Sequence, residues 1–153
     1  MPGAGGVIDR THKGKALPDL ILRDQQGGEL KLAGLKGKPA LINLWATWCA
    51  PCIAELPTLN AMANRADLKL AVVTVSQDMA QTEKVQPFLD QRGLAQLPGW
   101  LDPKGDLAFH YGVQTLPSTI LYDAAGQEVW RTTGERDWGS AESMALLAEG
   151  GAR

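Results

Sequence analysis

The sequence predicts an α/β fold with a central mixed sheet flanked by helices on both faces. Two nearly continuous apolar runs, residues 39–45 and 68–76, are typical of strands buried on both faces. Between them, residues 50–65 repeat apolar side chains at helical spacing, and this strand, helix, strand order implies a parallel crossover. Residues 118–123 and 127–133 read as two further strands joined by a tight turn, which adds an antiparallel pair to the sheet.

The composition fits one globular domain and excludes some functions. The chain has 153 residues, of which 44% are hydrophobic and 21% charged. The net charge of -2 offers no basic stripe for phosphate, so we expect no nucleic-acid partner. No apolar run reaches the roughly 18 residues of a membrane span, and the polar, glycine-rich start lacks the apolar segment of an export signal. We expect residues 1–16 to be a flexible tail and residues 17–150 to form the domain.

The first elements after the tail read as a β-hairpin. Residues 19–23 and 29–32 alternate apolar and polar side chains around a Gln-Gly-Gly turn. Residues 32–38 follow as a turn or short helical piece. The predicted buried strand at residues 39–45 then ends just before the two cysteines.

The helix at residues 50–65 follows the cysteines directly. Its apolar residues recur at intervals of three and four, as at Leu56, Leu59 and Met62. Pro57 lies inside this helix and is expected to kink it, because proline removes a backbone donor and crowds the preceding turn.

Three shorter helices are expected in the second half of the chain. Residues 82–93 form a helix that ends at a glycine, and residues 105–111 form a short helix within a region rich in turn formers. Residues 138–149 form a final amphipathic helix. We find no internal repeat and no second domain.

Both cysteines, Cys49 and Cys52, lie in the stretch WATWCAPCIAEL, and three kinds of site compete for them. A zinc site needs four ligands, and the chain offers only two histidines and carboxylates to complete it. Haem attachment would need His at position 53, where Ile53 stands. A peroxidase with a single reactive cysteine is disfavoured, because the peroxiredoxin pattern has Thr where this chain has Ala46.

A redox-active pair explains more of the local sequence. Unpaired backbone N–H groups and the helix dipole favour negative charge at a helix start, so Cys49 should have an increased thiolate fraction. Cys52, one turn further, lies within disulfide reach and could resolve a mixed disulfide formed by Cys49. Pro51 between them favours the helix start. An inert buried pair, or a module whose sulfurs bind copper or zinc, remains an alternative.

Two motifs resemble the thioredoxin superfamily, and specifically its TlpA/ResA-like extracytoplasmic thiol-disulfide oxidoreductases. They are WATWCAPC after the strand LINLW, and TLPSTILYDAAGQEV some sixty residues later. The likeness covers residues 17–149, and residues 76–112 resemble the insertion that separates this branch from plain thioredoxin. It implies a thioredoxin fold with an N-terminal β-hairpin and a central strand-helix insertion.

The resemblance also assigns roles to individual residues. It implies that Cys49 is the nucleophile, that Cys52 is the resolving thiol, and that Pro117 is a cis-proline facing them. Residues beside these three are then expected to contact the substrate: Trp48, Ala50, Pro51 and Leu116.

Glu55 is the expected proton acceptor for Cys52. Thioredoxin usually carries a buried Asp on the strand before its motif, and the matching position here is Asn43, which cannot accept a proton at neutral pH. Members of the ResA-like branch carry a carboxylate near the active site, and Glu55 stands one helical turn after Cys52. Partial desolvation would raise its pKa toward neutrality. The alternative is an exposed helix glutamate.

The Ala-Pro pair between the cysteines favours a reductase over a disulfide oxidase or isomerase, because it carries no positive charge to stabilise a thiolate. The resemblance implies reduction of disulfides in exported proteins, such as apocytochrome c or copper-delivery and oxidase-assembly factors, with a membrane-bound electron donor and no cofactor. We therefore expect a periplasmic or otherwise extracytoplasmic monomer, membrane-anchored if a longer protein carries the anchor. A cytosolic thioredoxin is the alternative.

Overall fold

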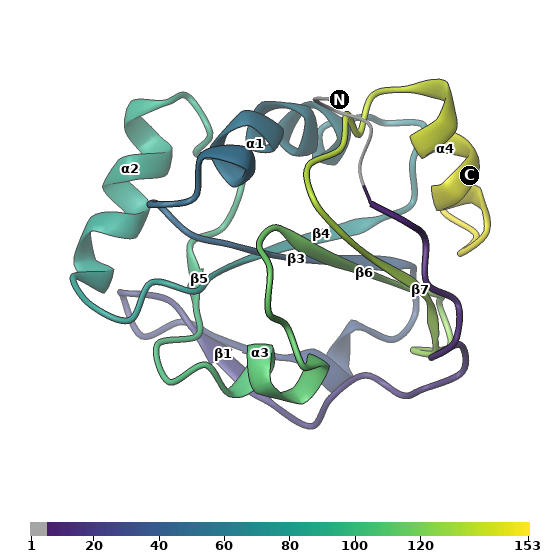
Figure 1. Ribbon diagram of the computed structural model, residues 1–153, viewed down its shortest axis with the longest axis horizontal. Coiled ribbons are helices and arrows are strands. Elements are labelled where there is room, and N and C mark those ends of the chain that lie inside the picture. Colours follow the sequence, from purple (N-terminus) through teal and green to yellow (C-terminus); the bar gives the residue numbers. More distant parts are fainter. Residues whose placement is uncertain (1–5) are drawn as a thin grey trace.

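The computed structural model describes residues 6–153, which build a seven-stranded mixed sheet in the order β2-β1-β5-β4-β3-β6-β7 (Figure 1). The strands are β1 (Ile21–Arg23), β2 (Glu29–Lys31), β3 (Ala40–Trp45), β4 (Ala71–Ser76), β5 (Trp100–Leu101), β6 (Ser118–Tyr122) and β7 (Glu128–Thr133). The helices are η1 (Leu32–Leu35), α1 (Ala50–Ala63), η2 (Thr82–Lys84), α2 (Val85–Gln91), α3 (Asp106–Tyr111) and α4 (Ala141–Ala148). This is the thioredoxin-like fold predicted from the sequence. No helix within residues 6–153 is long and apolar enough to cross a membrane.

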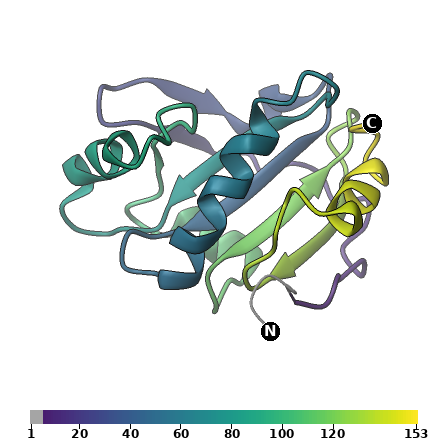
Figure 2. The same cartoon turned by 90° about the horizontal axis from the view of Figure 1, so that it is seen from above.

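The helices cover both faces of the sheet, as predicted. Helices α1, α2 and α4 lie on one face, and α3 lies on the other (Figure 1). Seen from above, α1 runs across the middle of the sheet, with α2 and α4 on either side of it (Figure 2). Each face therefore has its own hydrophobic core.

Strand β3 is the centre of this arrangement. It pairs in parallel with β4 and antiparallel with β6, and all six of its residues are buried. Leu41 and Trp45 belong to the core under α1, while Ile42 and Leu44 belong to the core on the opposite face. The continuous apolar run in the sequence is explained by this burial on both sides.

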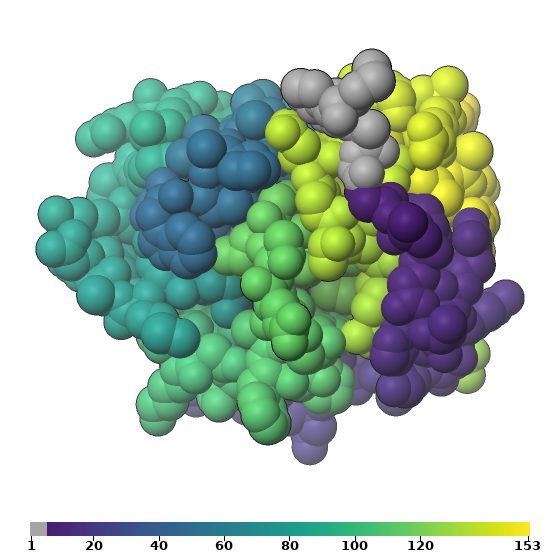
Figure 3. All heavy atoms as spheres, viewed as in Figure 1, coloured from purple at the N-terminus to yellow at the C-terminus, as the bar shows by residue number. Residues whose placement is uncertain are grey.

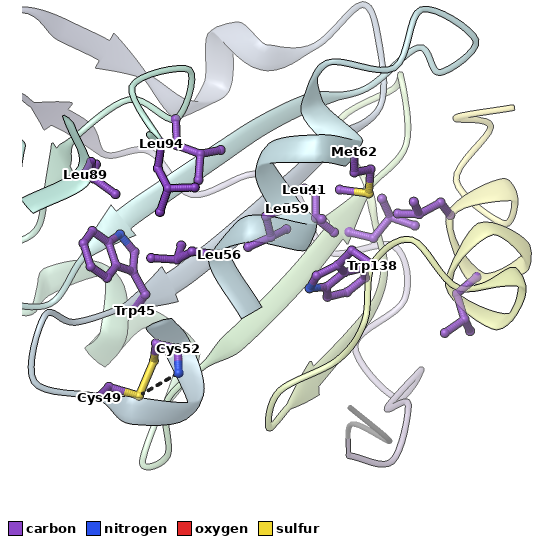
Figure 4. Close-up of a cluster of buried hydrophobic side chains, with 14 of the residues drawn as sticks. Leu41, Trp45, Cys49, Cys52, Leu56, Leu59, Met62, Leu89, Leu94 and Trp138 are labelled. Carbon is purple, nitrogen blue, oxygen red and sulfur yellow. Dashed lines mark hydrogen bonds between the residues drawn. A yellow bond between two sulfur atoms is a disulfide. The ribbon is translucent and has the colours of Figure 1, made fainter. Parts of the chain in front are cut away.

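Helix α1 packs on β3 through the apolar residues that the spacing indicated. Leu56, Leu59 and Met62 are buried with Trp45 in one cluster (Figure 4). Pro57 lies inside α1, and the helix continues past it to Ala63.

The sequence did not reveal β5. This two-residue strand pairs in parallel with β4 and antiparallel with β1, so it joins the N-terminal hairpin to the rest of the sheet. Two strand residues among turn formers carry no periodicity, which is why the sequence predicted only a turn-rich region there.

The sequence predicts a flexible tail over residues 1–16, whereas residues 9–16 are hydrogen-bonded to the sheet; residues 1–5 lie outside the described part of the chain. Asp9 and Arg131 exchange two backbone hydrogen bonds of 2.8 and 3.0 Å, and Glu128 N donates to Lys15 O at 2.7 Å. The segment therefore runs along β7, as the purple and yellow-green atoms show (Figure 3). An edge strand has unpaired backbone groups, and composition alone does not show which segment will pair with them.

Trp130 links β7 to α4, and its removal should destabilise the fold. Its buried ring stacks on Trp138 with centroids 6.2 Å apart, and its Nε1 donates to Leu146 O at 3.1 Å. We expect Trp130→Ala to lower the free energy of unfolding by about 3–5 kcal/mol, measured by chemical denaturation, because it leaves a large cavity. Phe109→Ala is the control, since that side chain is 89% exposed and should change stability by less than about 0.5 kcal/mol. Equal losses in the two variants would contradict this account.

Candidate active site

The two cysteines lie where β3 gives way to α1. Cys49 is the N-cap of α1, and its Sγ accepts a hydrogen bond of 3.3 Å from Cys52 N (Figure 4). Pro51 occupies the first turn, where a missing N–H costs no helical hydrogen bond. Cys49 and Cys52 form a disulfide across Cα atoms 5.3 Å apart. The sequence thus placed both sulfurs correctly at the start of a helix.

The surroundings of the two sulfurs differ. Cys49 retains 6% of its surface and Cys52 only 1%, while Trp48, next to Cys49, is 70% exposed. Trp45 is fully buried in the core, as expected from its place at the end of the apolar strand. The positive end of the α1 dipole lies at Cys49, where it favours a thiolate once the disulfide is reduced. Cys49 is therefore the sulfur that a partner reaches more easily.

The peptide bond between Leu116 and Pro117 is cis, as the resemblance implied. Strand β6 begins one residue later, and its first residue, Ser118, pairs with Leu44 of β3. Pro117 therefore lies beside the end of β3 from which the chain continues to the cysteines. Leu116 and Trp48 line one common groove.

Glu55 is buried, with 1% of its surface exposed, so the alternative of an exposed helix glutamate is wrong. Its Oε1 accepts from Asn43 Nδ2 at 2.8 Å, and its Oε2 accepts from the backbone N of Arg136 at 2.9 Å. Burial raises the pKa of Glu55 to about 7, although both hydrogen bonds favour the carboxylate. Residues three apart on a helix have Cβ atoms about 5–6 Å from each other, so Glu55 and Cys52 are neighbours on one side of α1.

Asn43 connects the carboxyl to the sheet. Its Nδ2 also donates to Thr119 Oγ1 of β6 at 3.0 Å, so a single amide joins β3, α1 and β6. The position where thioredoxin usually has an acid thus holds a hydrogen-bond donor that orients Glu55 instead.

Sequence reasoning missed two residues that support the site. Arg136 lies 81 positions after Glu55 and supplies a backbone donor to it. Asp78 fixes the segment before Cys49, since it accepts from Thr47 N at 3.0 Å, from Thr47 Oγ1, and from Ser76 Oγ at 2.7 Å. Neither residue belongs to a recognisable motif, because both act across loops that only the fold brings together.

Metal ligands do not gather in the part of the chain that the structure describes. No group of three or more His, Cys, Asp or Glu side chains within residues 6–153 could hold a metal ion.

The buried carboxyl should make folding stability depend on pH. Below about pH 4.5, the ordinary pKa of Glu55, the carboxyl is neutral in both the folded and the unfolded chain. As the pH rises toward about 7 the unfolded chain ionises first, so the contribution of Glu55 to stability is lost over this interval. We expect the stability of the oxidised wild type relative to Glu55→Gln to fall by about 3 kcal/mol between pH 4 and pH 8.

Urea denaturation of the two proteins at each pH measures this difference. Other titrating groups are common to both proteins and cancel. Glu83→Gln is the control, because it removes an exposed carboxyl. A difference between wild type and Glu55→Gln that stays constant with pH would show that Glu55 keeps an ordinary pKa.

Comparisons with known proteins agree with this geometry. Residues 13–129 match the AhpC/TSA family. The thiol-disulfide oxidoreductase ResA of Bacillus anthracis is 34% identical over 129 residues, which span 84% of this chain and 73% of that protein. The thioredoxin-like protein YneN of Bacillus subtilis is 36% identical over 116 residues, which span 74% and 67% of the two chains.

A solved structure shows the same fold. A putative thiol:disulfide interchange protein DsbE from Chlorobium tepidum superposes with a TM-score of 0.75 at 32% identity, covering 90% of this chain and 94% of that one. The fold, the cysteine pair and the relatives all support the same family and activity. The chain belongs to the AhpC/TSA family of thioredoxin-like proteins and is a thiol-disulfide oxidoreductase related to ResA.

Proposed function

We propose that this oxidoreductase is a reductase of disulfides in exported proteins. The observation that carries the proposal is the buried Glu55 carboxyl, one helical turn after Cys52 and with a pKa of about 7. A strong oxidant stabilises the thiolate of its reduced form. A carboxylate beside the cysteines opposes that thiolate, and the Ala-Pro pair adds no compensating positive charge. Both features lower the reduction potential and favour donation of electrons to a substrate.

The reaction begins with the reduced pair. The Cys49 thiolate attacks one sulfur of the substrate disulfide, which breaks that disulfide and forms a mixed disulfide between Cys49 and the substrate. The departing substrate sulfur takes up a proton. Cys49 is less completely buried than Cys52, at 6% against 1% of its surface, and it lies at the positive end of α1; both features support this role.

The second step belongs to Cys52 and Glu55. Cys52 transfers its proton to the Glu55 carboxylate and attacks the sulfur of Cys49. The Cys49–Cys52 disulfide forms, and the second substrate sulfur leaves as a thiol after protonation. Two electrons have then passed from the enzyme dithiol to the substrate. A base with a pKa near the working pH suits this transfer, and burial gives Glu55 that pKa.

Residues around the sulfurs would receive the substrate. Leu116, which precedes Pro117, and Trp48, which precedes Cys49, line one groove that the substrate would enter. Ala50 and Pro51 are exposed in the first turn of the helix and complete this surface.

The same resemblance supports the cellular setting that we propose. The protein would work as a monomer in the periplasm or another extracytoplasmic compartment, and a membrane-bound dithiol donor would reduce it again. Its two cysteines both belong to the motif, which suits an oxidising compartment where further thiols would pair wrongly. Cysteine-bearing apocytochromes and copper or oxidase assembly factors are the substrates proposed.

The reduction potential tests the direction of electron flow. We expect a value near or below about -250 mV when the Cys49–Cys52 pair is equilibrated against thiol-disulfide buffers, with tryptophan fluorescence as the readout. The exposed Trp48 beside Cys49 is the reporter. A value near about -120 mV would identify an oxidase and contradict the proposed effect of Glu55.

The role of Glu55 can be tested with a disulfide that releases a coloured thiol. Reduced enzyme and 5,5′-dithiobis(2-nitrobenzoate) should release one thionitrobenzoate when Cys49 attacks and a second when Cys52 resolves. We expect Glu55→Gln to slow the second phase by about 10²-fold at pH 7 and to remove its rise with pH near 7, because the proton acceptor is lost.

The first phase is the internal reference, since it precedes the proton transfer from Cys52. Glu83→Gln, which removes an exposed carboxyl, should resemble wild type in both phases. An unchanged second phase in Glu55→Gln would assign the proton to water or to another group.

A further inference from the structure

The side-chain amide of Asn43 has one unused end. Its nitrogen donates both hydrogens, to Glu55 Oε1 at 2.8 Å and to Thr119 Oγ1 at 3.0 Å. Its oxygen, Oδ1, is buried and accepts no hydrogen bond within residues 6–153. Buried polar atoms in folded proteins nearly always have a partner, so an unpaired one indicates a function or a second arrangement. Here the unpaired atom belongs to the side chain that hydrogen-bonds the carboxyl of Glu55.

The groups around Glu55 suit its ionised form. Burial has the largest effect on its pKa and raises it. Three donors lower that pKa: the amide of Asn43, the backbone N–H of Arg136 and the indole N–H of Trp138. Trp138 lies beside α1, where its backbone N donates to Thr58 Oγ1 at 3.2 Å (Figure 4). A carboxylate can accept from all three donors, whereas a protonated carboxyl must itself donate a hydrogen bond.

Only Asn43, among these three donors, also carries an acceptor. A backbone N–H and an indole N–H can donate but not accept, while an amide side chain has an oxygen as well. The proton of a neutral Glu55 can therefore be hydrogen-bonded by Asn43 Oδ1, provided that the amide turns.

The charged groups nearby do not replace Asn43 in this role. From the loop after β7, the Glu135 carboxylate raises the pKa of Glu55 by repulsion. The guanidinium of Arg136 donates to Glu142 Oε1 and to Gly6 O, at 3.1 Å each. From α1, the titrating neighbour is Cys52, which gives up the proton in the proposed reaction.

A half turn of the Asn43 amide brings the acceptor into place. The terminal torsion of asparagine is roughly two-fold, so this turn exchanges Oδ1 and Nδ2 without moving the backbone. Oδ1 then lies between Glu55 Oε1 and Thr119 Oγ1, in the position that Nδ2 occupies in the structure. Both neighbours can reverse their roles, since a protonated carboxyl donates and a threonine hydroxyl donates as well as accepts. The amide can thus bond the same two neighbours in either protonation state of Glu55.

We propose that Asn43 is a positioning residue whose amide turns over when Glu55 takes the proton of Cys52. This inference rests on the proposed function, in which Glu55 is the proton acceptor. Before the transfer Nδ2 donates to the carboxylate, and after it Oδ1 accepts from the neutral acid. The turn itself exchanges hydrogen bonds only. Because Asn43 bonds both forms of Glu55, the carboxyl keeps its position while its charge changes.

Nuclear magnetic resonance of the oxidised protein tests the turn, since the two cysteines form a disulfide there and do not titrate. The contact measured is the nuclear Overhauser effect between the Asn43 Nδ2 hydrogens and the side chain of Thr119. We expect this effect at pH 8.5, where Glu55 is mostly ionised, and its loss at pH 5.5, where Glu55 is mostly neutral. The amide signals of Asn43 should shift with the same midpoint as the carboxyl carbon of Glu55.

Two variants separate Glu55 from other titrating groups. In Glu55→Gln the pH dependence of the Asn43 signals should disappear. Glu135→Gln is the matched control, because it removes a nearby charge and leaves Glu55 in place. There the transition should persist and move to lower pH, since the Glu135 carboxylate raises the pKa of Glu55.

A kinetic test uses two side chains of similar shape at position 43. Asn43→Val removes both the donor and the acceptor, whereas Asn43→Thr supplies a hydroxyl that can act as either. We expect Asn43→Val to slow the release of the second thionitrobenzoate about tenfold relative to the first at pH 7, because one hydrogen bond to a charged group is worth roughly that factor. Asn43→Thr should recover part of the lost rate.

Three results would overturn the inference. One is an Overhauser effect with Thr119 that persists at pH 5.5 after the Glu55 carboxyl has titrated, which would make Asn43 a fixed donor. Another is an unchanged pH dependence of the Asn43 signals in Glu55→Gln. The third is an equal second phase in wild type and Asn43→Val. A reduction potential typical of an oxidase would instead refute the proposed function, and the transition of Asn43 in the oxidised protein would remain.

Discussion

The pairing of β3 with strands on both sides constrains the rest of the molecule. Its backbone bonds β4 and β6, and its side chains are buried in a core on each face. A strand held in this way has a fixed position and a fixed end, at Trp45. The chain leaves that end, is fastened by Asp78 through Thr47, and begins a helix at Cys49. The reactive sulfurs are thus positioned by a buried strand that is paired on both sides.

The same strand also determines the electrostatics of the site. Asn43 lies in the middle of β3 and donates a hydrogen bond to Glu55, which holds a carboxyl in an interior where it costs stability to ionise. A glutamine at position 55 would destabilise the folded protein less at neutral pH, because it has no charge to bury. A buried acid that lowers folding stability is typical of a functional site, where a group needed for the reaction is often unfavourable for folding.

Much of the fold could be predicted from the sequence, since long apolar runs and helical spacing report burial directly. Strands β3, β4, β6 and β7 and helix α1 follow from such patterns. Strand β5 could not be predicted, because two residues have no period. At the site, the spacing of Cys49, Cys52 and Glu55 along one helix carried most of the information. The partners of Glu55 and the groove residues Met79 and Phe109 could not be predicted, because they come from segments that meet only in the folded chain.

The segment of residues 6–16 has a consequence for assembly. It lies along β7, an edge strand, and hydrogen-bonds the outward-facing backbone there. Edge strands with free backbone groups are templates on which other chains add strands. The N-terminal segment therefore occupies backbone groups of β7 with which another chain could otherwise pair. We expect a shortened form that begins at residue 17 to keep its disulfide chemistry and to expose the backbone of β7, so that association would be controlled at an edge of the sheet and catalysis at its inner strand β3.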